Sequence, residues 1–521
     1  MPPSPVRPLP PPVPLLPNPA LLSPVRLGPP APTLWQRAWP RLNAAAGRSA
    51  LVAALVAALV AAAALPPDRP GLGWPIAGLG LLAPLGWALA RAGRTAARAE
   101  ALVWCAGALA LLSVGFFRAA GWLFALCVLS AWGCVALAAG RHRRAPAVLM
   151  GPFTLCFAAF RALPWARAGA VRLRGARGGT DALRLLASIG LGVALLILFG
   201  ALFAGADPAF DRVVTAVVPA FDAGTLARWI FVGTATGLLS LGAAFLVANP
   251  STIGEGPARA GRPVRRVEWL VPVGAVLALF GLFVAVQVTV LFGDRDYVMR
   301  TVGLTFAEYA RKGFWQLLAI TVLTLAVIGV TVRKAERRTR ADRTLLRLVL
   351  GPLAACALVV VGSALWRMNV YEQAYGFTRL RVFVSAVELW LGGLFVLIML
   401  AGLAGPRHRA AWLARAAAGL WVATLLGLAV LNPDRFIAAH NVDRGGASNA
   451  DVWYLRSLSA DAAPELDRLP PGARECALGE IAADLSEDAD DWRGWNLGRS
   501  RARQIVPEPV RAQGYPCYRR Y

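Results

Sequence analysis

The sequence predicts an all-α fold: a polytopic bundle of about eleven transmembrane helices with a small, mainly helical extramembrane domain at the C-terminal end. Three observations support this prediction. Of the 521 residues, 57% are hydrophobic and 16% are charged, and the mean hydropathy is +0.55. A soluble protein of this length would carry roughly 25% charged residues, so a water-soluble core cannot hold the apolar surplus. Apolar runs of about 17–25 residues also recur along the chain, with Arg-rich links between them.

The basic charge is explained by membrane topology rather than by nucleic acid. The formal net charge is +25, and 54 residues are Lys or Arg. These residues lie in short links between apolar runs, as the positive-inside rule describes, so we expect no nucleic-acid partner. The expected partner is the lipid bilayer itself, with anionic lipids at its inner face.

Residues 1–34 are Pro-rich, as in PPSPVRPLPPPVPLLPNP, and such a segment cannot build a core. We expect a disordered cytoplasmic tail, with an SH3-type ligand as the alternative. The first apolar run, SALVAALVAALVAAAAL, is Ala-rich and also resembles a signal peptide with AAAALPP as its cleavage site. Because the tail before it is long for a signal peptide, we favour a retained helix.

The expected spans form two groups along the chain. Residues 35–140 hold the first four helices, and residues 183–431 hold helices five to eleven. Their approximate centres are Val56, Leu81, Ala108, Val128, Ala194, Leu238, Leu279, Leu323, Val359, Leu394 and Leu420.

Residues 141–182 separate the two groups and are expected to form a basic cytoplasmic loop. Within it, APAVLMGPFTLCFAAF, Ala145 to Phe160, is apolar but short, and Arg-rich sequence flanks it on both sides. We expect an amphipathic helix on the inner membrane surface. The alternative is a further crossing, which would invert the sidedness of everything that follows.

The distribution of Arg and Lys predicts the orientation. With the N-terminus inside, the inner links hold about 26 of these residues and the outer links about 11. This asymmetry alternates with every crossing. We therefore expect a protein of the inner (plasma) membrane with a cytoplasmic N-terminus and an extracytoplasmic C-terminus.

Residues 432–521 differ in composition, with mixed charges, many Asp and Glu and no spanning run. We expect an extracytoplasmic C-terminal domain of about 90 residues, a size at which a single core is marginal. Its two cysteines, Cys476 and Cys517, would then lie in an oxidising compartment, and we predict a disulfide between them, with two free thiols as the alternative. The other five cysteines lie in apolar helices, where a thiol acts as a small hydrophobe.

Several motifs resemble a bacterial polytopic membrane family that is catalogued only as a domain of unknown function, of the 4153/4173 type. These motifs are ADPAF from Ala206, FAEYARKGFWQLL from Phe306, RMNVYEQAYGFTRLR from Arg367, NPDRFIAAHNVDR from Asn432 and DVWYLRSLSADAAPELDRL from Asp451. The resemblance covers roughly the second two-thirds of the chain. It implies a multi-pass inner-membrane protein and no established reaction or substrate.

In the predicted topology all of these motifs fall on the outer side. We expect their charged and aromatic groups to form one polar layer with the C-terminal domain. This layer is either a binding surface or a set of ion pairs that hold the domain on the bundle, and we favour the ion pairs. The candidates are Asp207, Asp211, Glu308, Tyr309, Arg311, Arg367, Glu372, Tyr375, Arg379 and Arg381.

Two polar residues lie inside predicted spans. A carboxylate at Glu388, in VFVSAVELWLGGLFVLIML, is costly unless it is paired, hydrated or protonated, so it is either a proton or ion site or the partner of Arg367, Arg379 or Arg381. For Gln287, in VAVQVTVLF, we expect a hydrogen bond between helices. The pair Gly233 and Gly237 forms a GxxxG pattern and indicates close helix packing.

No catalytic, cofactor or metal site is predicted. The three histidines, His142, His408 and His440, are scattered, and neither a phosphate-binding loop nor a nucleophile elbow occurs in the sequence. GxGxxA at Gly78 lies inside an apolar run with no preceding strand, so it predicts no nucleotide site.

Three classes of function remain from the sequence. The first is a cell-envelope scaffold or signalling protein, whose C-terminal domain contacts an envelope partner. The second is a transporter with a polar site near Glu388, although Asp and Glu are nearly absent from the middle of the spans. The third is a membrane enzyme acting on lipid or envelope precursors. We favour the first class; the sequence indicates no particular oligomeric state.

Overall fold

The computed structural model describes residues 38–39, 45–66, 68–91, 95–140, 144–175, 223–254, 264–292, 306–403, 412–449, 451–487 and 490–506, with isolated residues between 188 and 210. Within these ranges the elements are helices, accompanied by one isolated β-bridge between Val264 and Ala335. The predicted all-α helix bundle is confirmed.

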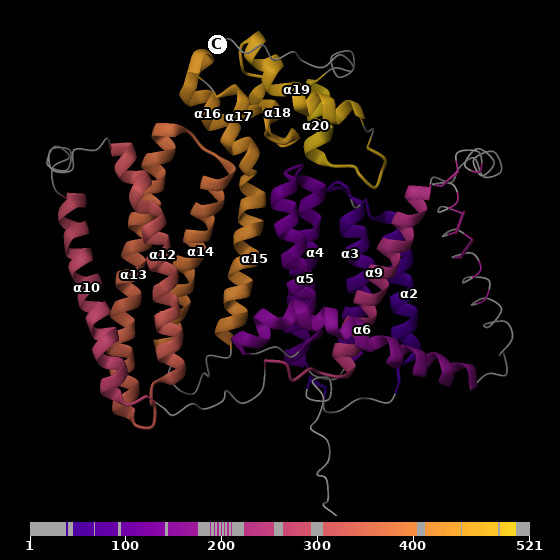
Figure 1. Cartoon of the computed structure of the whole chain (residues 1–521), viewed down its shortest axis with the longest axis horizontal. Coiled ribbons are helices and arrows are strands. Elements are labelled where there is room, and N and C mark those ends of the chain that lie inside the picture. The colour runs from indigo at the N-terminus through magenta and orange to yellow at the C-terminus, as the bar shows by residue number, and fades with distance from the viewer. Residues whose placement is uncertain are drawn as a thin grey trace, which may run out of the picture.

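The bundle helices stand side by side and run alternately in opposite directions (Figure 1). The loops that join them therefore lie at two ends, which we call the domain end, where the C-terminal domain sits, and the opposite end. The bundle helices are α2 (Arg48–Ala64), α3 (Gly73–Arg91), α4 (Thr95–Phe117), α5 (Gly121–Ala139), α9 (Ala223–Ala248), α10 (Arg266–Phe292), α12 (Phe306–Lys334), α13 (Arg340–Tyr375), α14 (Arg379–Leu403) and α15 (Leu413–Leu431).

Nine helices of the described part are long and apolar enough to cross a membrane. They are α4, α5, α6, α9, α10 and α12 to α15, while α2 and the first part of α3 are apolar but shorter. Ten of the eleven predicted centres fall on bundle helices. The remaining centre, Ala194, falls in the stretch of which only isolated residues are described.

Helix α6 (Ala145–Gly175) lies across the opposite end of the bundle instead of running along it (Figure 1). Its length and composition alone would allow a crossing. It is longer than the apolar segment that ends at Phe160, and its second half carries Arg161, Arg167 and Arg172. Close packing holds it there: a Cβ built at Gly242 of α9 would stand 2.8 Å from the backbone nitrogen of Ala159. That α6 lies on the inner membrane surface stays a prediction.

Two apolar cores form within the molecule. The first gathers buried residues of α3, α4, α5, α6, α9, α14 and α15 and continues into the C-terminal domain. The second gathers residues of α10, α12, α13 and α14. Helix α15 joins them through Trp421, which donates to Ser130 of α5 at 3.0 Å, and through the carbonyl of Ala417, which accepts from Trp390 of α14 at 3.2 Å.

Small residues bring α2 and α9 together. A Cβ built at Gly233 would stand 3.3 Å from the carbonyl oxygen of Ala58, and one at Gly237 would stand 3.2 Å from the Cβ of the same residue. The buried face of α2 consists of Ala54, Ala57, Ala61 and Ala64. The GxxxG pattern therefore serves close packing, as expected.

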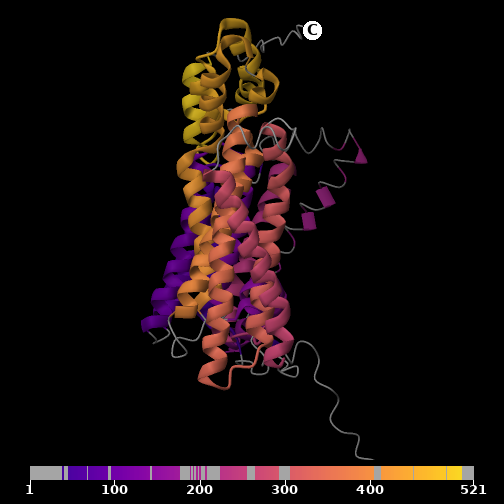
Figure 2. The same ribbon diagram turned by 90° about the vertical axis from the view of Figure 1, so that its left-hand side faces the viewer.

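The C-terminal domain stacks on the bundle at the domain end, as both views show (Figures 1 and 2). Its own apolar residues, such as Leu455, Leu466 and Leu478, are fully buried in the first core. Its helices are α16 (Pro433–Asn449), α17 (Val452–Arg456), the 3₁₀ turn η3 (Ala460–Ala462), α18 (Ala463–Leu466), α19 (Pro471–Glu487) and α20 (Leu497–Ile505).

Candidate functional site between the bundle and the C-terminal domain

Three loops at the domain end carry the C-terminal domain, and we call their contacts with it the docking seam. The loops are residues 65–72 between α2 and α3, 118–120 between α4 and α5, and 376–378 between α13 and α14. The first two belong to the side of the first apolar core, and the third joins two helices of the second side. The domain therefore contacts both halves of the bundle.

The first contact is an ion pair between Arg379, at the start of α14, and Asp434, in the first turn of α16. Arg379 Nε lies 2.9 Å from Asp434 Oδ1, and Nη2 lies 2.6 Å from Oδ2. Asp434 is completely buried, and it also accepts the backbone N–H of Ser459 at 2.9 Å and the indole N–H of Trp122 at 3.3 Å. Burial alone would raise the pKa of Asp434, but the bonds and charge of Arg379 and the Ser459 bonds keep it below its ordinary value.

The same corner is fixed by hydrogen bonds to its backbone. The hydroxyl of Tyr454 accepts the N–H of Arg379 at 2.6 Å. The side chain of Asn441 accepts the N–H of Phe377 at 2.7 Å and donates to its carbonyl at 2.9 Å. Gly376 has φ +79°, and a Cβ there would stand 2.7 Å from Asn441 Oδ1, so this turn requires glycine for both conformation and space.

The second contact places Asp461 at the N-terminus of α5. Its Oδ2 accepts the N–H groups of Ala119 at 2.7 Å and Ala120 at 3.2 Å. Free N–H groups and the helix dipole make such an end favourable for a carboxylate. The group is 4% exposed, and burial raises the pKa of Asp461 to about 6 although the two N–H donors and Arg118 oppose that shift.

Asn496 completes the second contact. Its side-chain nitrogen donates to the carbonyls of Gly115 at 2.7 Å and Arg118 at 2.9 Å, which lie at the end of α4. Its oxygen caps α20 by accepting the N–H of Arg499 at 3.1 Å. The buried amide of Asn496 thus binds the carbonyls at the end of α4 and caps the start of α20.

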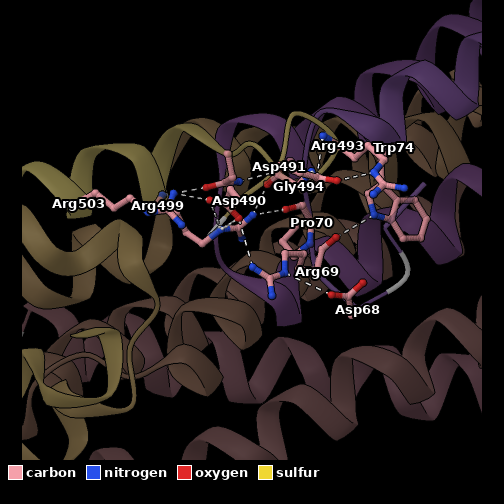
Figure 3. Close-up of polar contacts among 12 residues, drawn as sticks. Asp68, Arg69, Pro70, Trp74, Asp490, Asp491, Arg493, Gly494, Arg499 and Arg503 are labelled. Atoms are coloured by element: carbon pink, nitrogen blue, oxygen red, sulfur yellow. Dashed lines mark hydrogen bonds and ion pairs between the residues drawn. The ribbon is translucent and has the colours of Figure 1, made fainter. Parts of the chain in front are cut away.

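The third contact is centred on Asp490, whose side chain is 1% exposed (Figure 3). Its carboxylate accepts from Arg499 at 3.0 Å, from Arg503 at 2.6 Å and, across the seam, from Arg69 at 3.3 Å. Burial would raise the pKa of Asp490, but the bonds and charges of Arg499 and Arg503 keep it below its ordinary value. Arg499 also donates to the carbonyl of Pro70 at 2.8 Å.

Backbone hydrogen bonds strengthen the third contact. Leu72 donates to the carbonyl of Trp495 at 3.0 Å, and Gly73 donates to that of Arg493 at 2.8 Å. The two chains approach so closely that a Cβ at Gly71 would stand 2.6 Å from the Arg493 carbonyl oxygen. The loop between α2 and α3 is therefore bound by both side chains and backbone.

The predicted outer polar layer is brought together only in part. Arg379 reaches the C-terminal domain, as described above. Arg381 stays at the α13–α14 corner, where it donates to the carbonyl of Gly376 and places its guanidinium 4.2 Å from the ring centre of Tyr371. Glu372 is buried near the end of α13, and Tyr375 is exposed there. Of these four residues, Arg379 forms the expected ion pair with the C-terminal domain.

The other members of that layer lie elsewhere or outside the described part. Arg367 is buried in α13 against Gly313 of α12. Asp207 is exposed in the stretch of isolated residues. Glu308, Tyr309 and Arg311 belong to the first turns of α12, but their side chains lie outside the described residues, and so does Asp211.

The two polar residues within spans do not form one site. Gln287 Oε1 accepts from Ser363 of α13 at 3.3 Å, which is the hydrogen bond between helices that we expected. Glu388 is fully buried in α14, and neither of its carboxylate oxygens has a hydrogen-bond partner in the described structure. The expected pairing of Glu388 with Arg367, Arg379 or Arg381 is therefore wrong: Arg379 and Arg381 are bound to the groups named above.

The bonding state of six of the seven cysteines is described. Cys476 of α19 is disulfide-bonded. Cys517 lies outside the described residues, so its pairing with Cys476 stays a prediction. The five cysteines of the bundle and α6 are free thiols. Among the described residues no group of three or more His, Cys, Asp or Glu side chains is placed to hold a metal ion.

The sequence analysis missed most of the docking seam. Asp434 and Asp461 lie within the quoted motifs, but nothing in the motifs named their partners. Asp490 and Asn496 lie in a stretch, DADDWRGWNLGRSRAR, where three Asp residues are followed by four Arg residues, and this pattern is the signal of an ion-pair cluster. Arg69, the partner of Asp490, is the single basic residue in the loop of residues 65–72.

These features define a class: a multi-pass membrane helix bundle with a helical domain docked on one end. More specifically, the chain belongs to the family described as a domain of unknown function, DUF4153, which matches residues 106–469. No curated protein matches the chain, and no solved structure matches it. The family region holds Asp434 and Asp461 with their bundle partners, while Asp490 and Arg69 lie beyond its two ends.

Proposed function

We propose that the protein is a cell-envelope scaffold or signalling protein of the bacterial plasma membrane, with its C-terminal domain held outside the cytoplasm as a fixed platform for an envelope partner. The observation that carries this proposal is the docking seam. Three buried carboxylates, Asp434, Asp461 and Asp490, attach the domain to both halves of the bundle. A domain attached in this way moves with the membrane helices instead of swinging on a linker.

The orientation is supported by charge. The Arg-rich links and α6 lie at the opposite end, which the positive-inside rule assigns to the cytoplasm. Basic residues such as Arg161 and Arg167 would then face anionic lipid. The domain end, with its mixed charges, would face the envelope.

Transport is the alternative from the sequence, and it needs a polar route to Glu388. A cavity of about 630 Å³ opens at the opposite end, between the start of α10 and the loop before α13, and a second cavity of about 10 Å³ lies in the docking seam. The lining of neither cavity includes Glu388 or Gln287. We therefore base the proposed function on the docked domain.

Labelling of single cysteines tests the orientation. Ala483→Cys places a thiol on the exposed face of α19, and Arg338→Cys places one in the exposed loop between α12 and α13. A maleimide that cannot cross membranes should label the first variant in intact cells and the second only after permeabilisation. The unsubstituted protein provides the background. Labelling of Arg338→Cys alone in intact cells would overturn the proposed orientation.

Complementation of a deletion strain tests the platform. Envelope composition and solute uptake are compared in cells that carry the wild type, Asp434→Asn or Glu388→Gln. We expect the deletion to change the composition of the envelope. The Asp434→Asn protein should stay in the membrane but leave this change uncorrected, whereas the Glu388→Gln protein should restore the wild-type composition. If the deletion abolishes uptake of a solute, and Asp434→Asn restores that uptake while Glu388→Gln does not, the result would favour transport instead.

A further inference from the structure

Glu388 is a carboxyl group buried within the membrane-spanning part without a partner. It lies nine positions after Arg379, the first residue of α14, so it is about 14 Å along the helix from the domain end. The residue is 0% exposed, and both oxygens lack a hydrogen-bond partner in the described structure. An ionised carboxylate that is buried in this way without a hydrogen-bond partner from the protein is costly, and the uncharged acid costs far less to bury.

The basic groups that the structure describes on α14 and on the packed helices α13 and α15 have contacts other than Glu388. On α14 itself, Arg379 binds Asp434 of α16, and Arg381 binds the carbonyl of Gly376. On α15, Arg415 forms an ion pair with Glu100 of α4. On α13, Arg367 lies against Gly313 of α12, and it is not a hydrogen-bond partner of Glu388.

The position of Glu388 on its helix directs it toward α13. Residues seven positions apart share a helix face, so Arg381, Glu388 and Phe395 form one stripe along α14. Phe395 is fully buried in the core that α10, α12 and α13 build. One turn below Glu388, a Cβ at Gly392 would stand 3.2 Å from Cγ1 of Val361, so α13 and α14 are in close contact there.

The same stripe leads back to the domain end. At its upper end the guanidinium of Arg381 lies over Tyr371 of α13, and Glu372 is buried one turn before α13 ends. A second carboxyl group therefore stands between the polar corner at residues 376–378 and Glu388. Among the described residues Glu388 belongs to no group of three or more His, Cys, Asp or Glu side chains, whereas a divalent cation is usually held by several carboxylate or carbonyl oxygens.

We propose that Glu388 is an intramembrane proton-binding site. It holds its proton as a neutral carboxylic acid at neutral pH and exchanges that proton with water at the domain end along the contact of α13 and α14. This inference goes beyond the platform role and is independent of it.

Infrared spectroscopy of the full-length protein in lipid vesicles tests the proposal. At neutral pH the wild type should show the carbonyl band of a protonated carboxylic acid, and this band should move to lower frequency in D₂O. The band should be lost in Glu388→Gln and kept in Glu480→Gln, a matched change on the exposed surface of α19. A band that persists in Glu388→Gln, including one that disappears instead in Glu372→Gln, overturns the proposal. A band that does not move in D₂O overturns proton exchange.

Carbodiimide labelling tests the wild type without any substitution. The acid proton of a neutral carboxyl moves to a carbodiimide nitrogen while its oxygen forms a bond to the central carbon, and the adduct rearranges to a stable N-acylurea. Dicyclohexylcarbodiimide, which is lipid-soluble, should modify Glu388, whereas a water-soluble carbodiimide with an added amine should modify Glu480 and leave Glu388 intact. Peptide mass spectrometry that finds no dicyclohexylcarbodiimide adduct on Glu388 overturns the proposal.

Discussion

Arg379 and Asp434 form a two-point ion pair, with N–O distances of 2.9 and 2.6 Å, between the first residue of a bundle helix and the first turn of the C-terminal domain. The carboxylate is completely buried, while the side chain of Arg379 is 32% exposed. The same carboxylate accepts an N–H from Ser459, so it also joins two segments of the domain. This pair links the fold of the domain to its attachment on the bundle.

We expect Asp434→Asn to loosen the docked domain. The amide keeps the shape of the carboxylate but loses the charge that balances Arg379, and removing one partner of a buried pair costs about 3–5 kcal/mol. Hydrogen exchange at the amides of Ser459 and Arg379, which are bound across this site, should rise strongly. Asp443→Asn is the matched control, because Asp443 pairs with Arg468 on the exposed surface, and we expect a cost below about 1 kcal/mol. Equal protection of these amides in both variants would contradict the prediction.

The stability of the docked domain should depend on pH through three carboxyl groups whose pKa values are shifted in opposite directions. Burial raises the pKa of Asp461 to about 6 from an ordinary value of 3.8, so the folded state holds this proton more tightly than the unfolded chain. Its contribution falls as pH rises from about 4 through about 6, by at most about 3 kcal/mol. The pKa values of Asp434 and Asp490 lie below their ordinary range, so their stabilisation is present above about pH 4 and is lost as pH falls below it.

We therefore expect the stability of the domain to be maximal at about pH 4 and to decline toward pH 6. Thermal unfolding of the purified full-length protein at a series of pH values measures it. Asp461→Asn should remove most of the decline on the alkaline side and leave the acid limb unchanged. A decline that is the same in Asp461→Asn and in the wild type would assign it to another group.

The sequence predicted the parts of this fold that depend on local patterns. Apolar length placed the spans, Arg-rich flanks placed α6 across the end of the bundle, and small residues placed the contact of α2 with α9. The docking seam depends instead on groups that meet only after folding. Asp461 accepts the N–H of Ala119, which is 342 positions away in the sequence. A helix N-terminus attracts any suitably placed carboxylate. No local pattern identifies which carboxylate arrives.

The surroundings of Glu388 also could not be predicted from local sequence patterns. Its place in an apolar run was visible, and so were three arginines that could have paired with it. Arg379 binds the C-terminal domain, Arg381 binds the loop at Gly376, and Arg367 lies against Gly313 of α12, which local sequence patterns did not show. Helix α14 also begins at Arg379, so Glu388 lies deeper than the apolar run alone indicated.

Gly376→Ala should weaken the α13–α14 corner. The residue has φ +79°, which disfavours a side chain, and an added Cβ would collide with Asn441. We expect a loss of about 1–3 kcal/mol, seen as a lower thermal midpoint and faster exchange at the amide of Phe377. Gly362→Ala is the control: it lies within α13, no atom stands within 4 Å of its built Cβ, and alanine there should be neutral or slightly stabilising. A control that loses as much as Gly376→Ala would remove the role assigned to the turn.

Asp490→Asn should release the loop between α2 and α3. Three arginines would lose their shared carboxylate, and we expect a cost of about 3 kcal/mol. The readout is specific, because the amides of Leu72 and Gly73 donate across this contact and should exchange faster while that of Ser459 is unaffected. Asp467→Asn, which breaks an exposed pair with Arg474, serves as the control and should leave both sets of amides unchanged. Faster exchange at Ser459 together with Leu72 would show that the contacts act as one unit and contradict this separation.

Reduction should destabilise the C-terminal domain through the bond at Cys476. This residue is disulfide-bonded, and the predicted partner is Cys517, which would close a loop of 41 residues and restrict the unfolded chain. Loss of such a link costs about 2–4 kcal/mol in a small domain. Alkylation of the unfolded protein with and without reductant should differ in mass by two alkyl groups, both on peptides that contain Cys476 and Cys517. Cys356→Ser, which removes a free thiol of α13, should leave that difference intact. An unchanged mass after reduction, or a linked peptide that pairs Cys476 with another residue, would refute the predicted bond.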